Sequence, residues 1–294
     1  MLASIVIRTL NEARHLEDLL KAIAGQQTGN DLAVETIVID SGSEDGTLAI
    51  AANYACRVLH IKREEFSFGR SLNHACAAAR GEILVMVSGH CVPTGAAWLQ
   101  ALCQPIIDGA ATYSYGRQLG GLASRYSECR IFAKYFPEQS AIPQEGYYCN
   151  NANAALAKSA WETHRFDEDL TGLEDMDLAK RLVAAGGKVA YVAESCVYHH
   201  HYEQWASVQR RFERESIALR HIMPQVHIRK RDLLRYVLSS IYLDSQAARQ
   251  EGVWARKLAE IITYRLRQYW GSFKGNHEHR RLSNTQKDRY FYPN

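Results

Sequence analysis

Apolar strand-like runs alternate with helix-like segments over residues 1–108 of this 294-residue chain, and this alternation limits the fold more than any other feature. Each short β-branched run is followed by a segment with apolar residues at helical spacing. Such alternation predicts an α/β fold with a Rossmann-like, mostly parallel mixed sheet flanked by helices. The expected strands are Ser4–Arg8, Val34–Asp40, Arg57–Ile61 and Glu82–Ser88, and the expected helices are Glu12–Ala24, Leu48–Tyr54, Gly69–Arg80 and Ala96–Asp108.

The pattern changes in the second half of the chain. Residues 109–170 are less regular, and Glu174–Ala185 and Lys188–Ala193 then predict one more helix and one more strand. From Gln204 onward the sequence is mostly helix-like, basic and rich in aromatic residues. We therefore expect a ligand-binding α/β domain over residues 1–203 and a helical C-terminal region over residues 204–294.

Charge is distributed unevenly between these two parts. Residues 203–294 contain 18 lysines and arginines against 9 acidic residues, whereas residues 1–202 contain 17 against 23. A mildly acidic N-terminal part joined to a basic C-terminal part predicts that the two parts have different functions. The longest apolar run, Leu233–Leu243, is short and contains Arg235, whereas a transmembrane helix needs about 20 apolar residues.

The seven cysteines indicate the compartment. Their number is odd and none forms a C-x-x-C pair, which argues against a zinc knuckle or a disulfide framework. They predict a reducing environment and hence a cytoplasmic location, with the thiols acting as small buried apolar groups. No basic segment or cleavage site precedes the first strand, so we expect no signal peptide.

Polar residues end several of the expected strands, and ligands of parallel sheets bind beyond the carboxyl ends of the strands. Asp40 opens the glycine-containing loop Ser41–Thr47, where a carboxylate can accept hydrogen bonds from a nucleotide or simply cap a tight turn. Thr9, Asn11 and Glu12 follow the first strand, where they can contact a ligand, cap a helix, or do both.

Histidines lie near the ends of two further strands. Ser88-Gly89-His90 closes one strand, and His199 and His201 follow the strand Lys188–Ala193. In an extended segment these last two side chains point the same way. Imidazole is a common ligand of borderline metals, so His90 with His199 predicts a partial metal site; a solvated loop is the alternative.

Acidic residues begin the helix expected at Glu174–Ala185. Carboxylates in a first turn favour the helix dipole by about 0.3–1 kcal/mol, and Asp177 is also spaced to pair with Arg181. A carboxylate held at a helix start can instead act as a general base that takes a proton from an attacking hydroxyl. The spacing of Glu174 and Asp175 leaves both interpretations open.

Six segments, in the right order, resemble the family 2 glycosyltransferases, which share the fold called GT-A. The resemblance covers about residues 4–215 and leans toward bacterial rhamnosyltransferase-like enzymes. The segments are Ile5–Glu12, like the first strand with its Asn-Glu signature; Ile37–Thr47, like the nucleotide loop; Phe68–Asn73 with Ala79–Glu82, like the stretch before the metal motif; Cys149–Ala155, like the acceptor-side strand; Phe166–Glu168 with Glu174-Asp175, like the stretch ending in the Glu-Asp pair; and Val197–His199, like the later metal-site histidine.

The resemblance implies an inverting transfer of a hexosyl or deoxyhexosyl group from a dTDP-, UDP- or GDP-sugar to a hydroxyl of a glycan or lipid-linked acceptor, in bacterial surface polysaccharide synthesis. It makes residues 1–203 the catalytic, nucleotide-sugar-binding domain. Asp175 would be the base, assisted by Glu174. The implied nucleotide contacts are Thr9, Asn11, Glu12, Asp40, Ser41, Arg70 and Asn73, and the implied acceptor or donor-sugar contacts are Asn150 and Asn153.

One position departs from the family pattern. The family usually carries Asp-x-Asp, or at least one Asp, where this chain has Ser88-Gly89-His90. Because Mg²⁺ prefers oxygen ligands, the loss of both carboxylates favours Mn²⁺ held by His90 and His199, or a site without metal. The departure keeps two alternatives open, a non-catalytic nucleotide-sugar or glycan-binding module and a nucleotidyltransferase. No reader motif indicates nucleic-acid binding.

The basic tail predicts peripheral attachment to an anionic membrane surface, which would be the inner membrane. Arginines cluster at 210, 211 and 214, and Arg229–Arg231 precede the run Leu233–Leu243. Aromatic residues, which favour the headgroup level, are interleaved: Trp205, Tyr236, Tyr242, Trp254, Tyr264, Tyr269, Trp270 and Phe273. The alternative is that these aromatics pack against the first domain or against a second subunit in a homodimer.

Overall fold

The computed structural model describes residues 1–29 and 32–278, which form two compact units. The first unit contains residues 1–121, 136–169 and 174–200. The second contains residues 122–135, 170–173 and 201–278. Each unit is therefore assembled from segments that are far apart in the sequence.

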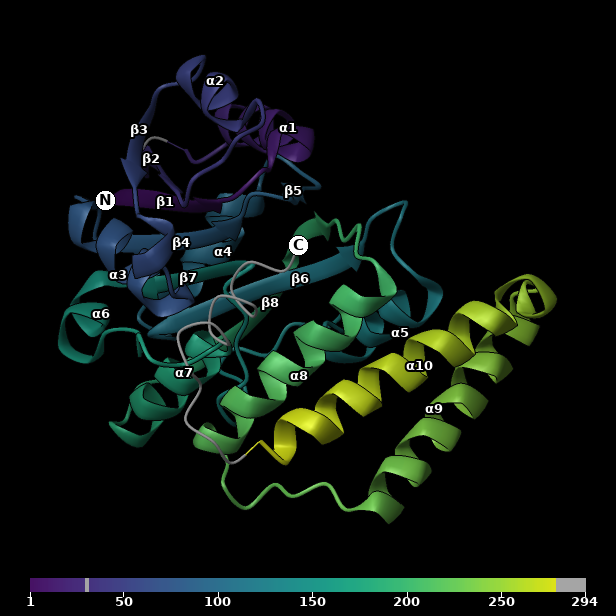
Figure 1. Ribbon diagram of the computed structural model, residues 1–294. Coiled ribbons are helices and arrows are strands. Elements are labelled where there is room, and N and C mark those ends of the chain that lie inside the picture. Colours follow the sequence, from purple (N-terminus) through teal and green to yellow (C-terminus); the bar gives the residue numbers. More distant parts are fainter. Residues whose placement is uncertain (30–31, 279–294) are drawn as a thin grey trace. The chain divides into compact units, whose positions relative to one another are not determined.

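An eight-stranded mixed sheet is the centre of the first unit, with the order β3-β2-β1-β4-β7-β6-β8-β5 (Figure 1). The strands β3, β2, β1 and β4 run parallel, as do β6 and β8, whereas β7 and β5 run antiparallel to their neighbours. The bounds are β1 Leu2–Thr9, β2 Ala33–Asp40, β3 Cys56–His60, β4 Ile83–Ser88, β5 Cys91–Pro93, β6 Tyr113–Gly120, β7 Asn153–Ala157 and β8 Val189–His199.

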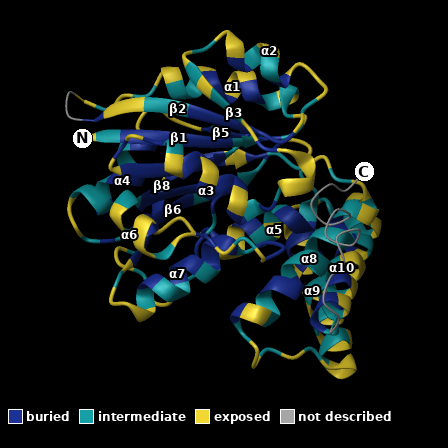
Figure 2. Cartoon of the chain, turned by 60° about the vertical axis from the view of Figure 1, so that its left-hand side comes forward, coloured by how far each residue is buried: buried dark blue, intermediate teal, exposed yellow. Residues whose placement is uncertain are grey.

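Helices cover both faces of this sheet, which explains why its central strands are continuous apolar runs rather than alternating ones. Figure 2 shows these strands in dark blue, the colour of buried residues. Along β1, Ala3, Ile5 and Ile7 share a core cluster with buried residues of α1 and α4, because side chains alternate along a strand. The helices of this unit are α1 Ala13–Ala24, α2 Thr47–Ala52, α3 Phe68–Ala78, α4 Trp98–Ile107, α6 Lys158–His164 and α7 Glu174–Ala184, with a 3₁₀ turn η1 at Arg63–Glu65.

The elements expected before residue 108 are all present, with ends shifted by up to about two residues. Two strands in the stretch expected to be irregular, β6 and β7, were not predicted from periodicity, because their sequences are rich in small and polar residues. β8 is longer than the predicted Lys188–Ala193 and ends at His199. A register shift opposite Gly116 and Arg117 absorbs the extra residues of β8, so His199 lies in a strand rather than in the following loop.

The second unit is helical. It contains α5 Tyr126–Tyr135, α8 Trp205–Ile222, α9 Lys230–Gln250 and α10 Trp254–Asn276. Two glycines of α10, Gly271 and Gly275, let this helix approach α8 closely, because a Cβ at either position would collide with the backbone carbonyls of Gln209 or Glu213. Among the helices that the structure describes, none is long and apolar enough to cross a membrane.

Candidate active site

The ends of several strands meet along one edge of the sheet in the first unit. The register pairs Thr9 with Asp40, Arg8 with Ser88 and Gly120 with His199, so β1, β2, β4, β6 and β8 all end there. β7 runs the opposite way and begins at Asn153, which places the preceding residues at the same edge. Most of the predicted site residues lie at this edge.

Asp40 is buried at 1% exposure, and its carboxylate is surrounded by donors from its own loop. It accepts hydrogen bonds from the Thr9 hydroxyl at 3.0 Å, from the backbone N–H groups of Gly42 and Ser43 at 2.9 Å each, and from the Ser43 hydroxyl. The buried Ser41 hydroxyl donates to the Thr9 carbonyl at 3.1 Å. A carboxylate has about four lone-pair sites, and these four hydrogen bonds use them to hold the loop in place. The contact of Asp40 with a nucleotide stays a prediction.

Hydrogen bonds join the loop after β1 to the loop after β2. The backbone N–H of Asn11 donates to the Ser43 hydroxyl at 2.8 Å, and the Asn11 side-chain oxygen accepts from the Glu44 N–H at 2.9 Å. The Glu12 N–H donates to the Thr47 hydroxyl at 2.8 Å. Asn11 has a positive φ of 57°, a conformation that Asn tolerates better than most residues. The two loops therefore form one hydrogen-bonded surface at the strand edge.

Arg70 and Asn73 on α3 hold the segment 166–168. Arg70 Nε donates to Glu168 Oε2 at 2.8 Å, and Asn73 Nδ2 donates to the Phe166 carbonyl at 2.9 Å. Asn73 Oδ1 accepts from Trp161 Nε1 at 3.0 Å, so both ends of this buried amide are occupied. Both residues therefore connect α3 to the segment 166–168. Their contacts with a nucleotide stay predictions.

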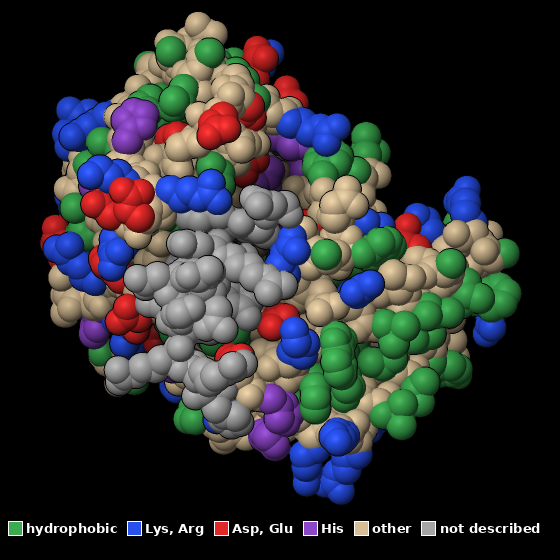
Figure 3. Space-filling model, viewed as in Figure 1, with side chains coloured by type: hydrophobic (Ala, Val, Ile, Leu, Met, Phe, Trp, Pro, Cys, Tyr) green, Lys and Arg blue, Asp and Glu red, His purple; other side chains and the backbone are tan. Residues whose placement is uncertain are grey.

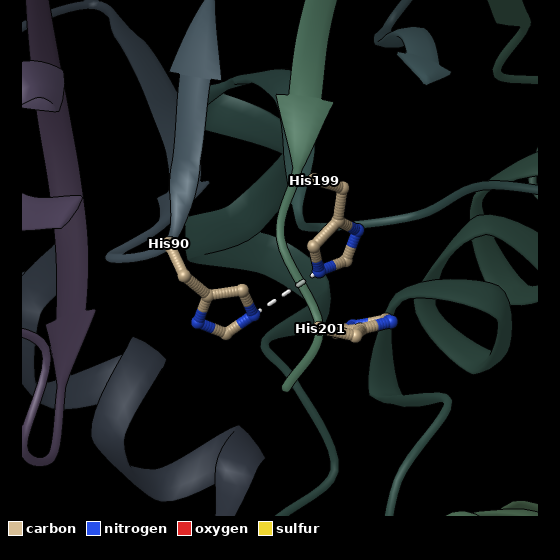
Figure 4. Close-up of side chains that lie close together, drawn as sticks. All are labelled: His90, His199 and His201. Carbon is tan, nitrogen blue, oxygen red and sulfur yellow. Dashed lines mark hydrogen bonds between the residues drawn. The ribbon is translucent and has the colours of Figure 1, made fainter. Parts of the chain in front are cut away.

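His90 and His199 face each other across 3.1 Å, measured between their Nε2 atoms (Figure 4). The other ring nitrogen of each histidine is also fixed. His90 Nδ1 lies 2.7 Å from Glu12 Oε1, and His199 Nδ1 lies 2.7 Å from Gln118 Oε1. Gly89 makes room for this arrangement, because a Cβ there would lie within 2.8 Å of the Glu12 side chain.

The geometry of this pair fits one divalent cation. Two neighbouring imidazole ligands with metal–nitrogen distances of about 2.0–2.1 Å lie roughly 3.0–3.4 Å apart, which includes the 3.1 Å observed. Glu12 and Gln118 occupy the outer positions from which acceptors orient metal-bound histidines. Without a metal, the same distance is an N–H···N hydrogen bond only when one of the two rings carries a proton on both nitrogens, because both Nδ1 atoms face acceptor oxygens. His201 belongs to the second unit, where its Nδ1 lies 2.8 Å from Glu128 Oε1.

Asp175 lies in the first turn of α7 at 7% exposure. Its carboxylate accepts hydrogen bonds from the backbone N–H groups of Asn151 at 2.8 Å and Met176 at 2.7 Å. Burial, and after it the charge of neighbouring Glu174, raises the pKa of Asp175 from its ordinary 3.8 to about 7, against the lowering effect of these hydrogen bonds. A carboxyl group with a pKa near neutrality is well matched to accept a proton.

Arg8 is a site residue that the sequence did not single out. Its Nη1 lies 3.5 Å from Glu174 Oε1, and its guanidinium carbon lies 4.8 Å from the centroid of the Phe68 ring. Its positive charge also opposes the rise in the pKa of Asp175. The signal that could have found it is a charged residue near the end of a buried apolar strand, Leu2–Thr9.

A continuous series of contacts joins most of these groups. Gln118 Nε2 donates to Asn150 Oδ1 at 3.0 Å, and the next residue, Asn151, donates its backbone N–H to Asp175. The series runs from one end of the site to the other through Glu12, His90, His199, Gln118, Asn150, Asn151, Asp175, Glu174 and Arg8. The predicted catalytic and metal-binding residues therefore lie in one connected site.

Asn153 does not present an atom to this site. Its side chain is 0% exposed; Oδ1 accepts from Trp98 Nε1 at 2.8 Å, and Nδ2 donates to the Ser195 carbonyl at 2.8 Å. These bonds hold β7 to α4 and β8 inside the core. Asn153 therefore has no place in the site proposed below, whereas Asn150 keeps one.

The model of "Glycosyl transferase family 2" matches residues 4–160, which is more than half of the chain. The chain belongs to this family. It is 29% identical over 193 residues to the O-antigen chain rhamnosyltransferase WbaN of Salmonella anatum, covering 61% of each chain. It is 28% identical over 226 residues to the O-antigen chain rhamnosyltransferase RfbN of Salmonella typhimurium, covering 72% of this chain and 71% of that protein. The match thus spans about three fifths to seven tenths of these relatives' length.

Two solved structures show the same fold at low sequence identity. The mannosyltransferase PcManGT of Pyrobaculum calidifontis, in complex with GDP-Man and Mn²⁺, matches with a TM-score of 0.60 at 15% identity, over 99% of this chain and 87% of its own. TarS 1-349 of S. aureus, in complex with UDP-GlcNAc, matches with a TM-score of 0.57 at 14% identity, over 95% and 93%. These similarities confirm the GT-A fold that the sequence predicts.

Within this family 2 chain, residues 88–90 remain the departure from the usual pattern. The structure places His90 beside His199 at the end of β4, where the resemblance implies Asp-x-Asp. An imidazole, that of His90, thus stands where the resemblance implies a carboxylate, and it faces His199, which matches the later histidine of the family pattern. The Nδ1 atoms of the two rings are held by Glu12 and Gln118.

Proposed function

We propose that this chain is an inverting glycosyltransferase that moves a sugar from a nucleotide-sugar donor to a hydroxyl of a glycan or lipid-linked acceptor. The observation that carries the proposal is the position of Asp175, a buried carboxyl that accepts the Asn151 N–H at the strand edge in a chain of family 2. The rise in its pKa to about 7, caused by burial and then by the charge of Glu174, supports the same role. The two O-antigen chain rhamnosyltransferases among the relatives support a role in bacterial surface polysaccharide synthesis and make a rhamnosyl donor the first to test.

In the proposed reaction, the Asp175 carboxylate takes the proton of the acceptor hydroxyl. The hydroxyl oxygen forms a bond to the anomeric carbon while the bond from that carbon to the diphosphate oxygen breaks on the opposite face. The nucleoside diphosphate leaves with the bonding electron pair, and this single displacement inverts the anomeric configuration. Glu174 raises the pKa of Asp175, and Arg8 balances the charge of Glu174.

His90 and His199 are the residues that would hold a divalent cation, with Glu12 and Gln118 fixing their rings. Nitrogen ligands suit Mn²⁺ better than Mg²⁺, which prefers oxygen. Such a cation, when bound, neutralises negative charge that develops on the diphosphate leaving group. The solved mannosyltransferase complex with Mn²⁺ supports testing this ion first.

A donor panel tests the proposed function. dTDP-, UDP- and GDP-sugars are compared by thermal shift, with and without Mn²⁺, because a ligand that binds only the folded state raises the melting temperature. The donor that shifts it is then offered with acceptor glycans, and the product anomer is read by NMR. Inverted product supports the proposal and retained configuration contradicts it. Donor binding without transfer to any acceptor would favour the non-catalytic binding module.

A second experiment tests the metal. His90→Ala should abolish Mn²⁺ binding measured by electron paramagnetic resonance, whereas the control His60→Ala, at the exposed end of β3, should leave it unchanged. Full transfer activity in excess chelator would contradict a metal role. It would leave the histidine pair as a hydrogen-bonded element of the site.

A further inference from the structure

Exposed apolar side chains form a face on the α9–α10 helix pair of the second unit. Leu234, Leu238 and Tyr242 are spaced by four residues on α9, and Ile262, Leu266 and Trp270 are spaced by four on α10. Residues at this spacing share one side of a helix. Leu238 and Tyr242 are 58% and 59% exposed, although Val237 and Tyr264 of the same helices are buried. We call these six residues the α9–α10 apolar face.

The face is continuous and unusually apolar for a protein surface. Figure 3 shows hydrophobic side chains extending along both helices, with Lys and Arg at the ends of this area. Isolated exposed leucines need no explanation, but a contiguous apolar area that spans two helices marks an interaction surface. Tyr264, by contrast, packs inside the unit against Phe212, so only some of the tail's aromatics are available for a partner.

The charged residues around the α9–α10 apolar face indicate the charge of the partner that binds there. Every exposed charged residue within α9 and α10, both described throughout, is basic: Lys230, Arg231, Arg235, Arg249, Arg256, Arg267 and Lys274. Of the acidic residues of these helices, Asp244 is buried against Arg265, and Glu260 and Asp232 are partly buried beside Lys257 and Arg229. One exposed acidic residue, Glu251, lies in the turn between α9 and α10, so the surroundings of the face are basic in balance. A partner must therefore offer negative charge around an apolar interior.

We propose that the α9–α10 apolar face binds the surface of an anionic lipid bilayer. A helix pair with an apolar face and basic flanks lies in the plane of the interface, with its apolar side about 5–10 Å into the headgroup region. Tyr242 and Trp270 carry the side-chain types that favour the headgroup level. A second copy of the chain fits less well, because a symmetric contact would bring two mostly basic rims together.

Arg211, one of the basic residues that suggested membrane contact from sequence, has a different role. Its Nη2 lies 2.6 Å from Glu128 Oε1 and 2.7 Å from Glu203 Oε2. These ion pairs join α8 to α5 inside the second unit and leave the guanidinium occupied. The surface that we assign to lipid is therefore carried by α9 and α10, not by the arginine cluster of α8.

Vesicle co-sedimentation of the full chain tests the proposal. The chain should pellet with vesicles of equal parts phosphatidylglycerol and phosphatidylcholine at low salt, lose binding as salt rises, and stay in the supernatant with phosphatidylcholine alone. The double variant Leu238→Ser with Leu266→Ser should bind at least about tenfold more weakly, because burial of both leucines is lost. The matched control, Leu122→Ser with Ile142→Ser, changes two other exposed apolar residues and should bind like the wild type.

A second pair of variants tests the charge. Arg231→Glu with Arg235→Glu should weaken binding to anionic vesicles, whereas Lys62→Glu with Lys188→Glu, an equal charge change on exposed residues of the first unit, should not. Wild-type protein that stays in the supernatant with anionic vesicles at low salt overturns the proposal. So does a leucine variant that pellets like the wild type, or one that converts a dimer to a monomer in ultracentrifugation. The vesicles contain neither donor nor acceptor, so these outcomes are independent of the proposed sugar transfer.

Discussion

Two buried carboxyl groups, one in each unit, have opposite pKa shifts. Asp175 of the first unit and Glu128 of the second are 7% and 3% exposed, and each lies in the first turn of a helix. Burial raises the pKa of both groups. For Glu128, hydrogen bonds and charges of His201 and Arg211 outweigh burial and lower the pKa to about 2. For Asp175, the charge of Glu174 adds to burial, and the pKa reaches about 7.

The neighbouring charges suit Glu128 to a structural role and Asp175 to the catalytic role that we propose. Glu128 Oε1 lies 2.8 Å from His201 Nδ1 and 2.6 Å from Arg211 Nη2, so its charge is matched and ties α5 to α8. Among the described residues, Asp175 accepts hydrogen bonds from two backbone N–H groups and stands beside another acid, an arrangement that costs stability but suits the proton acceptor that we propose. Burial alone therefore does not distinguish the two roles; the neighbouring charges do.

The largest effect on the transfer rate should come from replacing Asp175, the proposed proton acceptor. Asp175→Asn should lower the transfer rate by on the order of 10²–10⁴-fold while donor binding, measured by calorimetry, stays close to that of the wild type. The matched control is Asp177→Asn on the same helix turn, which loses only the 2.8 Å ion pair with Arg181 and should keep transfer. If Asp175→Asn kept more than about a tenth of the wild-type rate, Asp175 would not be the base.

The corresponding change in the second unit, at Glu128, should lower the free energy of unfolding and leave the transfer rate unchanged. Glu128→Gln removes the charge that faces Arg211 and His201 and leaves Arg211 with the charges of Glu203 and Glu215. Breaking a buried ion pair costs about 3 kcal/mol or more of unfolding free energy. Below its melting transition the variant should still transfer sugar. Glu138→Gln, which loses an ion pair on a side chain that is 83% exposed, is the control and should change stability by less than about 1 kcal/mol in denaturant titrations. If both variants lost the same unfolding free energy, the ion pairs of Glu128 would contribute no more than an exposed pair.

The transfer rate should depend on pH through Asp175. Because the base must be ionised, the rate should rise as pH passes upward through about 7 and then level off. The measurement is kcat against pH with saturating donor. Residual activity of Asp175→Asn should lack this rise, and a wild-type profile that is flat between pH 5 and 8 would contradict the assignment.

The smallest effect, and the most direct contrast, is the pH dependence of stability. The folded pKa of Asp175 lies above its unfolded value, so its contribution to stability is lost as pH rises from about 4 to 7. The folded pKa of Glu128 lies below its unfolded value, so its contribution is lost as pH falls from about 4.5 to 2. Melting temperatures of wild type, Asp175→Asn and Glu128→Gln should therefore diverge in opposite pH ranges. If the melting temperatures of both variants changed with pH in the same way, the two carboxyl groups would not have opposite pKa shifts.

Local sequence patterns determined much of the first unit. The apolar runs and the helical spacing predicted four strands and four helices before residue 108, because the spacing of apolar residues follows the period of burial in each element. They did not predict the short strand β5 at Cys91–Pro93. Strand-end polar residues indicated where a ligand site lies, and the resemblance to family 2 directed attention to Asp175 and to the Ser88–His90 departure. The strands β6 and β7 were not evident from periodicity, because small and polar residues mask the pattern.

Tertiary structure alone decided which groups meet and what each can do. His90 and His199 are 109 residues apart in sequence, and Arg8 and Glu174 are 166 apart, so no local pattern could reveal either pair. Sequence spacing also could not distinguish Asn150, which lies in the connected site, from Asn153, which is buried in the core. The pKa of Asp175 and the exposure of the α9–α10 apolar face depend on burial and on charges brought together by folding. Residue types and local periodicity belong to the sequence, whereas desolvation and long-range contacts exist only once the chain has packed.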